Sequence, residues 1–149
     1  MSDRSELEQA AIRLLTNREH SRLELSRKLQ SRCDDRNLLS EVLDDLERSG
    51  YLSDDRFTEL YVNYRKQKGF GPIRIRQELQ ERGISTDLIY AWLDSRDHQW
   101  LELLEECSRR KFGDASPGDF KEQTKRARFL EYRGYPSELI RSYLWGNDF

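Results

Sequence analysis

Residues 79–93 read LQERGISTDLIYAWL, and their pattern of side chains occurs twice more in the chain. Residues 29–43 read LQSRCDDRNLLSEVL, and residues 130–144 read LEYRGYPSELIRSYL. Each copy has apolar residues at its first, eleventh and fifteenth positions and an arginine at its fourth. Because a fixed period of about 50 residues is typical of stacked supersecondary units, the sequence predicts three tandem repeats.

The correspondence continues upstream of these segments. The matching positions are Leu7, Ala10, Ala11 and Leu14 in the first copy, Phe57, Leu60, Tyr61 and Tyr64 in the second, and Trp100, Leu103, Leu104 and Cys107 in the third. In the third copy they lie farther from residue 130 than the period predicts. We therefore expect an inserted loop near residues 113–118, where glycine and proline gather.

Helical periodicity dominates the chain. Apolar residues recur at i, i+3, i+4 and i+7 in most segments, whereas alternating runs rich in β-branched residues are missing. The sequence predicts an all-α fold with helices at 5–17, 21–32, 36–49, 54–68, 72–82, 86–95, 97–112, 119–133 and 136–145. Short connections between successive helices are typical of helix-turn-helix-like bundles. The predicted domains are three-helix repeats at residues 1–52, 53–95 and 96–149.

Start and stop signals agree with these ranges. Ser21 and Glu24 have the spacing of a capping box, and Gly71 precedes Pro72 as a first helical residue. Left-handed C-caps are expected at Gly50, Gly69, Gly83 and Gly134.

The composition leaves room for only a thin core in each repeat. Apolar residues make up 36% of the 149 residues, and charged residues make up another 36%. The chain has neither an apolar run long enough to span a membrane nor an apolar signal segment, so we expect a soluble cytoplasmic protein. We also expect it to be a monomer. Cys33 and Cys107 stand in no metal-binding pattern and are expected to be buried thiols.

Charge is unevenly distributed, although the formal net charge is only -2. Residues 41–59 have a net charge of -5, while residues 65–82 and residues 109–133 each have +4. The candidate binding residues in the two basic stretches are Arg65, Lys66, Lys68, Arg74, Arg76, Arg109, Arg110, Lys111, Lys121, Lys125, Arg126 and Arg128. An anionic partner is the functional interpretation; cations that complement the C-terminal ends of helices are the structural one.

Two features favour the functional interpretation. The helix that starts at Pro72 is expected to present its first amides, at Gly71 and Pro72, to a phosphate or carboxylate between flanking bases. Lys121, Lys125 and Arg128 fall at i, i+4 and i+7 on one helix face, where like charges repel unless an anion lies opposite. Neutralisation by nearby glutamates is the alternative for this second group.

The sequence does not favour an enzyme. His20 and His98 are isolated and are interpreted as surface or helix-terminal residues. The chain has no phosphate-binding glycine loop, zinc-protease motif or nucleophile elbow. We expect no catalytic residue, no metal and no cofactor.

Four segments in order resemble the RecX family of bacterial RecA regulators. They are Ser53–Phe57, Gly69–Pro72, Arg82–Ile84 and the run from Lys125 to Gly134. The resemblance covers about residues 8–145. It implies three three-helix repeats in an elongated, curved arrangement that binds the RecA filament on single-stranded DNA and inhibits ATP hydrolysis, strand exchange and filament growth. Acidic residues such as Asp44 and Asp54 would then meet basic recombinase loops.

One departure concerns Arg126, whose counterparts Leu25 and Ile75 are apolar. We expect the third repeat to pack less tightly than the others or to expose this helix more. The competing function is a helical-repeat protein that binds DNA or RNA directly, without a recombinase. Steep salt dependence on bare nucleic acid would favour that alternative, because phosphate contacts release counterions.

Overall fold

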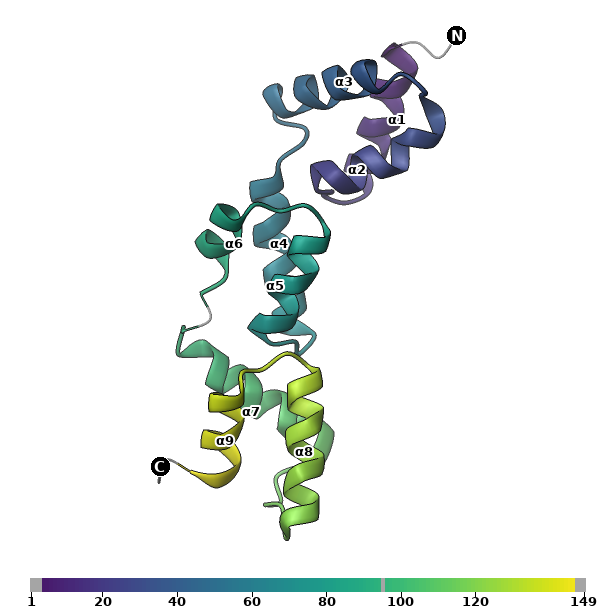
Figure 1. Ribbon diagram of the computed structural model, residues 1–149. Coiled ribbons are helices and arrows are strands. Elements are labelled where there is room, and N and C mark those ends of the chain that lie inside the picture. Colours follow the sequence, from purple (N-terminus) through teal and green to yellow (C-terminus); the bar gives the residue numbers. More distant parts are fainter. Residues whose placement is uncertain (1–3, 95, 147–149) are drawn as a thin grey trace. The chain divides into compact units, whose positions relative to one another are not determined.

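The computed structural model describes residues 4–94 and 96–146, and in these ranges it contains only helices and connections. The α-helices are α1 (Arg4–Asn17), α2 (Arg22–Leu29), α3 (Arg36–Arg48), α4 (Asp54–Gln67), α5 (Pro72–Glu81), α6 (Thr86–Trp92), α7 (Gln99–Phe112), α8 (Phe120–Tyr132) and α9 (Ser137–Trp145) (Figure 1). A 3-10 helix, Gln30–Arg32, follows α2. The predicted all-α fold is confirmed. Among the described helices, none is long and apolar enough to cross a membrane.

The described residues form two compact units. One unit contains residues 4–61 and 79–89, and the other contains residues 62–78, 90–94 and 96–146. We call them unit 1 and unit 2. The division passes through α4, α5 and α6, so the middle repeat contributes to both units.

Unit 1 contains the first repeat, in which α1, α2 and α3 pack against one another. The core residues that these helices bury include Ala11, Leu25, Leu29 and Val42, all inaccessible to solvent. The capping box at the start of α2 is confirmed, since the Ser21 hydroxyl accepts from the Glu24 amide and the Glu24 carboxylate accepts from the Ser21 amide. Local sequence signals therefore fix where α2 begins.

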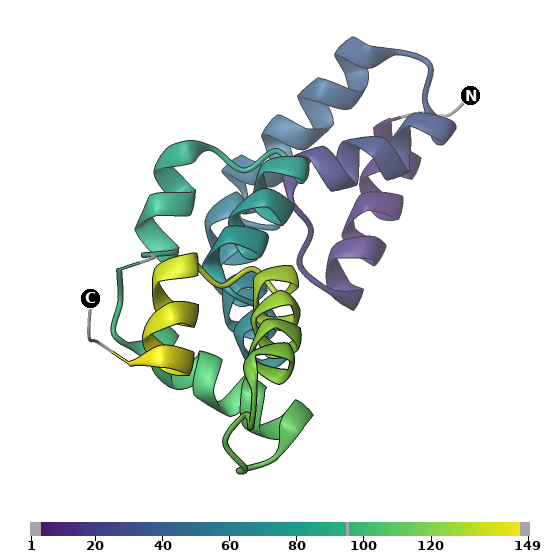
Figure 2. The same cartoon turned by 60° about the horizontal axis from the view of Figure 1, so that its bottom comes forward.

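Unit 2 contains the third repeat, in which α7 packs against both α8 and α9. Figure 2 shows α8 and α9 side by side, in yellow-green and yellow. Trp100, Leu104 and Leu130 are buried in its core. The predicted loop at 113–118 is confirmed as the connection between α7 and α8.

The glycine C-caps are confirmed at the four predicted positions. Their φ angles are +86° at Gly50, +90° at Gly69, +77° at Gly83 and +100° at Gly134, in the left-handed region. The prediction of buried thiols is confirmed as well, since Cys33 and Cys107 are both free and buried.

Two details differ from the expected pattern. Helix α6 ends at Trp92, and the predicted end at residue 95 lies outside the described residues. In α4 the repeat positions Leu60 and Tyr64 are 55% and 54% exposed, because the buried face of this helix includes Thr58 and Val62 instead.

Candidate functional site

A cavity of about 340 Å³ lies in unit 2 where the C-terminal ends of three helices meet. Its wall is formed by residues 66–69 at the end of α4 and just beyond it, by residues Leu103, Glu106, Cys107, Arg110 and Lys111 of α7, and by residues Phe129 and Arg133 at the end of α8. The structure thus brings Lys66 and Lys68 of the first basic stretch together with Arg110 and Lys111 of the second. The two lysines lie more than 40 positions before Arg110 and Lys111 in the sequence.

The cations of the cavity contact mainly neutral groups. Lys66 Nζ lies 3.1 Å from Gln99 Oε1 and 4.9 Å from the centre of the Trp100 ring. Lys68 Nζ lies 5.5 Å from the centre of the Tyr64 ring. Such cation–π contacts position an ammonium group without neutralising its charge.

Two further cations of the cavity, one from α7 and one from the end of α8, also contact neutral groups. Lys111 Nζ lies 5.5 Å from the centre of the Phe129 ring. Arg133 donates to the carbonyl oxygen of Lys68 at 3.0 Å, and its guanidinium lies 5.1 Å from the same Phe129 ring. The sequence did not indicate that Arg133 would line a cavity. Only the fold shows that the end of α8 faces the ends of α4 and α7.

Glu106 is the one carboxylate among the residues that line this cavity. Its two oxygens accept from Arg109 at 2.8 Å and from Arg110 at 3.0 Å. Arg109 also forms an ion pair with Asp114 at 3.4 Å. Arg109 and Arg110 therefore have acidic partners, whereas the lysines across the cavity do not share them.

Phe70 lies under a group of three guanidinium groups next to this cavity. The ring centre is 3.8 Å from Arg65 Cζ, 4.5 Å from Arg74 Cζ and 4.6 Å from Arg133 Cζ. The Glu78 carboxylate accepts from Arg65 at 2.8 and 2.9 Å and from Arg74 at 3.3 Å. Arg65 and Arg74 are thus held by a shared carboxylate and an aromatic face, and their role in the packing of unit 2 is evident.

The predicted anion site at the first amides of α5 is wrong. The Gly71 amide donates to the carbonyl oxygen of Arg133 at 2.8 Å, and the Ile73 amide donates to that of Gly134 at 3.0 Å. Pro72, between them, has no amide hydrogen. The end of α8 therefore caps the start of α5, and Figures 1 and 2 show these two helix ends next to each other.

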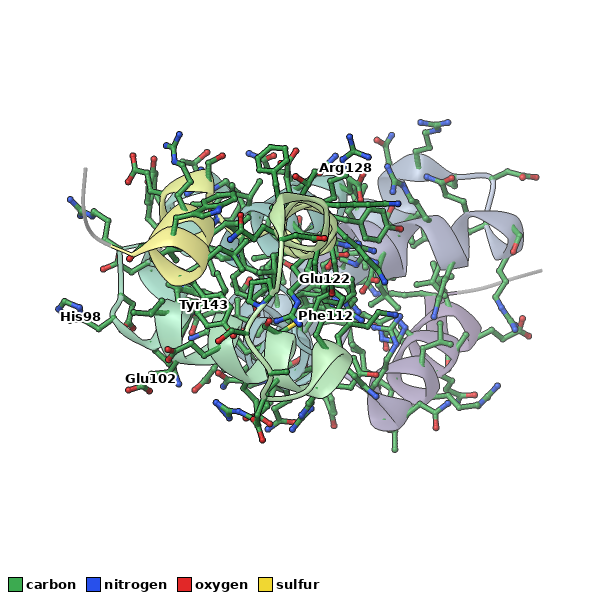
Figure 3. All side chains as sticks on the ribbon, turned by 90° about the horizontal axis from the view of Figure 1, so that it is seen from below. His98, Glu102, Phe112, Glu122, Arg128 and Tyr143 are labelled. Carbon is green, nitrogen blue, oxygen red and sulfur yellow. The ribbon has the colours of Figure 1, made fainter. Side chains whose placement is uncertain are left out.

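Arg126, the departure on which the expectation about the third repeat rests, is itself buried. Arg126 is only 6% exposed. It donates to Glu122 Oε1 at 3.2 Å and to the carbonyl oxygen of Ala115 at 2.8 Å, and its guanidinium lies 5.1 Å from the Phe112 ring. Figure 3 shows Glu122 and Phe112 on the inner side of α8 and Arg128 on its outer side. In the third repeat, a buried arginine paired with Glu122 therefore stands where the other repeats have the apolar core residues Leu25 and Ile75.

The remaining candidate residues lie away from the cavity. Lys121, Lys125 and Arg128 are exposed on α8 beside Phe120, which is 77% exposed. Arg76 lines a different cavity of about 930 Å³, next to α7 and the start of α9. The twelve candidate residues are therefore distributed over several surfaces of unit 2 and its core.

The acidic residues of unit 1 are largely paired within that unit. Arg22 forms ion pairs with Asp44, at 2.8 Å, and with Glu47. The Asp54 carboxylate accepts from the Arg22 amide at 2.7 Å, and burial raises the pKa of this carboxyl. Asp45 pairs with two further arginines. These contacts neutralise much of the charge that the sequence had suggested for a recombinase contact.

His20 is buried rather than on the surface. Its Nδ1 lies 3.0 Å from the carbonyl oxygen of Arg18, and its Nε2 lies 2.8 Å from Lys28 Nζ. Burial lowers the pKa of His20, and the nearby cations act in the same direction. Within the described ranges, no group of three or more histidines, cysteines or acids is arranged to hold a metal ion.

Fold and site together define a helical-repeat protein in which basic side chains from separate helices surround a cavity. Comparison with models of protein families shows to which family of helical-repeat proteins the chain belongs. The model described as "RecX, second three-helix domain" matches residues 53–93, and the model described as "RecX, third three-helix domain" matches residues 97–144. This chain belongs to the RecX family.

Individual relatives agree with this assignment. The regulatory protein RecX of Pseudomonas savastanoi pv. phaseolicola is 43% identical over 136 residues, which cover 91% of this chain and 88% of that protein. The regulatory protein RecX of Pseudomonas tolaasii is 42% identical over 138 residues, which cover 93% and 89%.

Solved structures show the same fold. The crystal structure of RecX from Lactobacillus salivarius has a TM-score of 0.74 at 20% identity and covers 93% of this chain and 92% of that one. A crystal structure of regulatory protein RecX has a TM-score of 0.77 at 16% identity and covers 97% of this chain and 73% of that one.

Proposed function

We propose that this protein regulates the RecA recombinase by binding its filament on single-stranded DNA, with inhibition of ATP hydrolysis, strand exchange and filament growth. The observation that carries the proposal is the basic cavity of unit 2, in a chain whose relatives are named regulatory proteins. A filament presents DNA phosphates and acidic side chains, and both suit a cluster of cations.

The repeat architecture supports the same function. Repeats add length without requiring a deep core, so a short chain can contact several subunits of a polymer. Binding of this kind needs no catalytic group, and inhibition follows from occupation of surface that the filament uses. The protein is expected to act as a monomer in the cytoplasm.

The test compares binding to RecA filaments on single-stranded DNA with binding to the bare DNA, at several salt concentrations. We expect preference for the filament together with loss of its ATPase activity. Equal or tighter binding to bare DNA, with steep salt dependence and an unchanged ATPase, would instead support the alternative of direct nucleic-acid binding.

A charge-reversal pair tests the surface. Arg110→Glu with Lys111→Glu changes two exposed residues of the cavity, so we expect much weaker inhibition with intact helical content. Arg27→Glu with Arg36→Glu is the matched control, because both arginines are exposed on unit 1 and the change in charge is the same. Equal inhibition by the two double variants would remove the cavity from the mechanism.

A further inference from the structure

The positive charge that lines the unit 2 cavity is larger than the charge required to offset the dipoles of the three helices that end there. Five cations and one carboxylate line it, which gives a net charge of +4. Each helix C-terminus is equivalent to roughly half a negative charge, so the three ends that meet here supply only about -1.5. More than half of the positive charge is left without a structural explanation.

Four of the five cations lack an acidic partner within the described part of the chain. The Glu106 carboxylate, which lines the cavity, pairs with Arg109 and Arg110, and Arg109 also pairs with Asp114. The remaining cations contact rings, an amide oxygen or a carbonyl oxygen. Cations held together in this way repel one another, and a bound anion would offset that repulsion.

Part of the cavity lining is uncharged. It contains Leu103, Phe129 and Cys107, and Cys107 is only 7% exposed. Burial raises the pKa of the Cys107 thiol, so the sulfur stays protonated near neutral pH. The Phe129 ring contacts Lys111 and Arg133, and it packs nearly perpendicular to the ring of Phe112.

From this geometry we infer that the cavity is a phosphate-binding site, in which the ammonium groups of Lys66, Lys68 and Lys111 and the guanidinium of Arg133 surround one phosphoryl group and its neighbour. Phosphoryl oxygens accept charge-assisted hydrogen bonds from several donors at once, whereas a single carboxylate offers fewer acceptors. The phosphoryl group belongs either to a nucleic-acid backbone or to a free polyphosphate. The first source rests on the proposed function; phosphate binding itself does not.

Pyrophosphate serves as the probe, with the full chain alone in solution. We expect saturable binding by titration calorimetry, with amide chemical-shift changes centred on residues 66–69 and 107–111. Lys66→Gln with Lys111→Gln should weaken binding by about tenfold or more, since two charged donors are lost. Arg27→Gln with Arg36→Gln is the matched control, because both arginines are exposed on unit 1 and neither lines the cavity.

Competition then identifies the source of the phosphoryl group. Displacement of pyrophosphate by a short oligothymidylate assigns the site to the nucleic-acid backbone, and a lack of displacement assigns it to free polyphosphate. Absence of saturable binding, or equal binding by the cavity variant and the control, would overturn the inference. Neither result requires RecA, so a failure here is distinct from a failure to inhibit the filament.

Discussion

Gly71 lies directly against Gly134, and the two glycines join the start of α5 to the end of α8. A Cβ on Gly71 would lie 2.5 Å from the carbonyl oxygen of Gly134. A Cβ on Gly134 would lie 2.4 Å from the Cβ of Arg74. The first repeat has Ser21 at the position that corresponds to Gly71, and its hydroxyl caps α2. Loss of that side chain in the second repeat permits the backbone contact with Arg133 and Gly134.

Gly71→Ala should therefore destabilise unit 2 by about 1–3 kcal/mol, the usual cost of overpacking, because the added methyl meets backbone atoms that cannot rotate away. Urea unfolding monitored by circular dichroism measures the change. Gly118→Ala is the control, since no atom lies within 4 Å of its added Cβ. Equal free energies of unfolding for the two variants would contradict the close contact.

Leu79→Ala should lower the free energy of unfolding by about 2–5 kcal/mol, because Leu79 is fully buried and its loss leaves a cavity. Leu60→Ala provides the comparison, since Leu60 is 55% exposed despite its apolar repeat position. A melting midpoint for Leu79→Ala that equals that of Leu60→Ala would show that the repeat core is assigned wrongly.

Unit 1 should lose stability as the pH falls below about 6.5, the ordinary pKa of histidine. Burial holds the folded pKa of His20 below that value, so the unfolded chain binds more protons in this range and the free energy of unfolding decreases as the pH is lowered. His20→Gln should reduce this dependence, whereas His98→Gln, at an exposed position, should not. Thermal melts between pH 7 and pH 5 make the comparison; identical slopes for the two variants would exclude His20.

Arg126→Leu should change the free energy of unfolding by only about 1 kcal/mol, because removal of one partner of an ion pair is strongly destabilising only where the other charge stays buried. Its partner Glu122 is 35% exposed and can be hydrated once the guanidinium is gone. If the proposed function is correct, inhibition of strand exchange should be the same for this variant as for the wild type. A folded Arg126→Leu protein without inhibitory activity would show instead that this arginine contacts the partner.

The sequence alone predicted the elements of this fold well, because the signals that define them are local. The capping box at Ser21 and the left-handed glycine at Gly134 act within a few residues of the helix ends that they define. The 50-residue period identified the copies because corresponding helices need apolar residues at corresponding positions. Even the inserted loop at 113–118 follows from a shift in that period.

Only the tertiary structure decided how the basic residues are used. The sequence could not show that Lys66 and Lys111 share a cavity, or that the carbonyl oxygen of Arg133 accepts a hydrogen bond from the Gly71 amide. These contacts join residues more than 40 positions apart. It also could not show that Arg126 is buried, since a charged residue on an apolar face is buried only where distant groups, here Phe112 and Ala115, supply its partners. Helices follow from neighbouring residues, whereas the environment of a charge depends on every segment that packs around it.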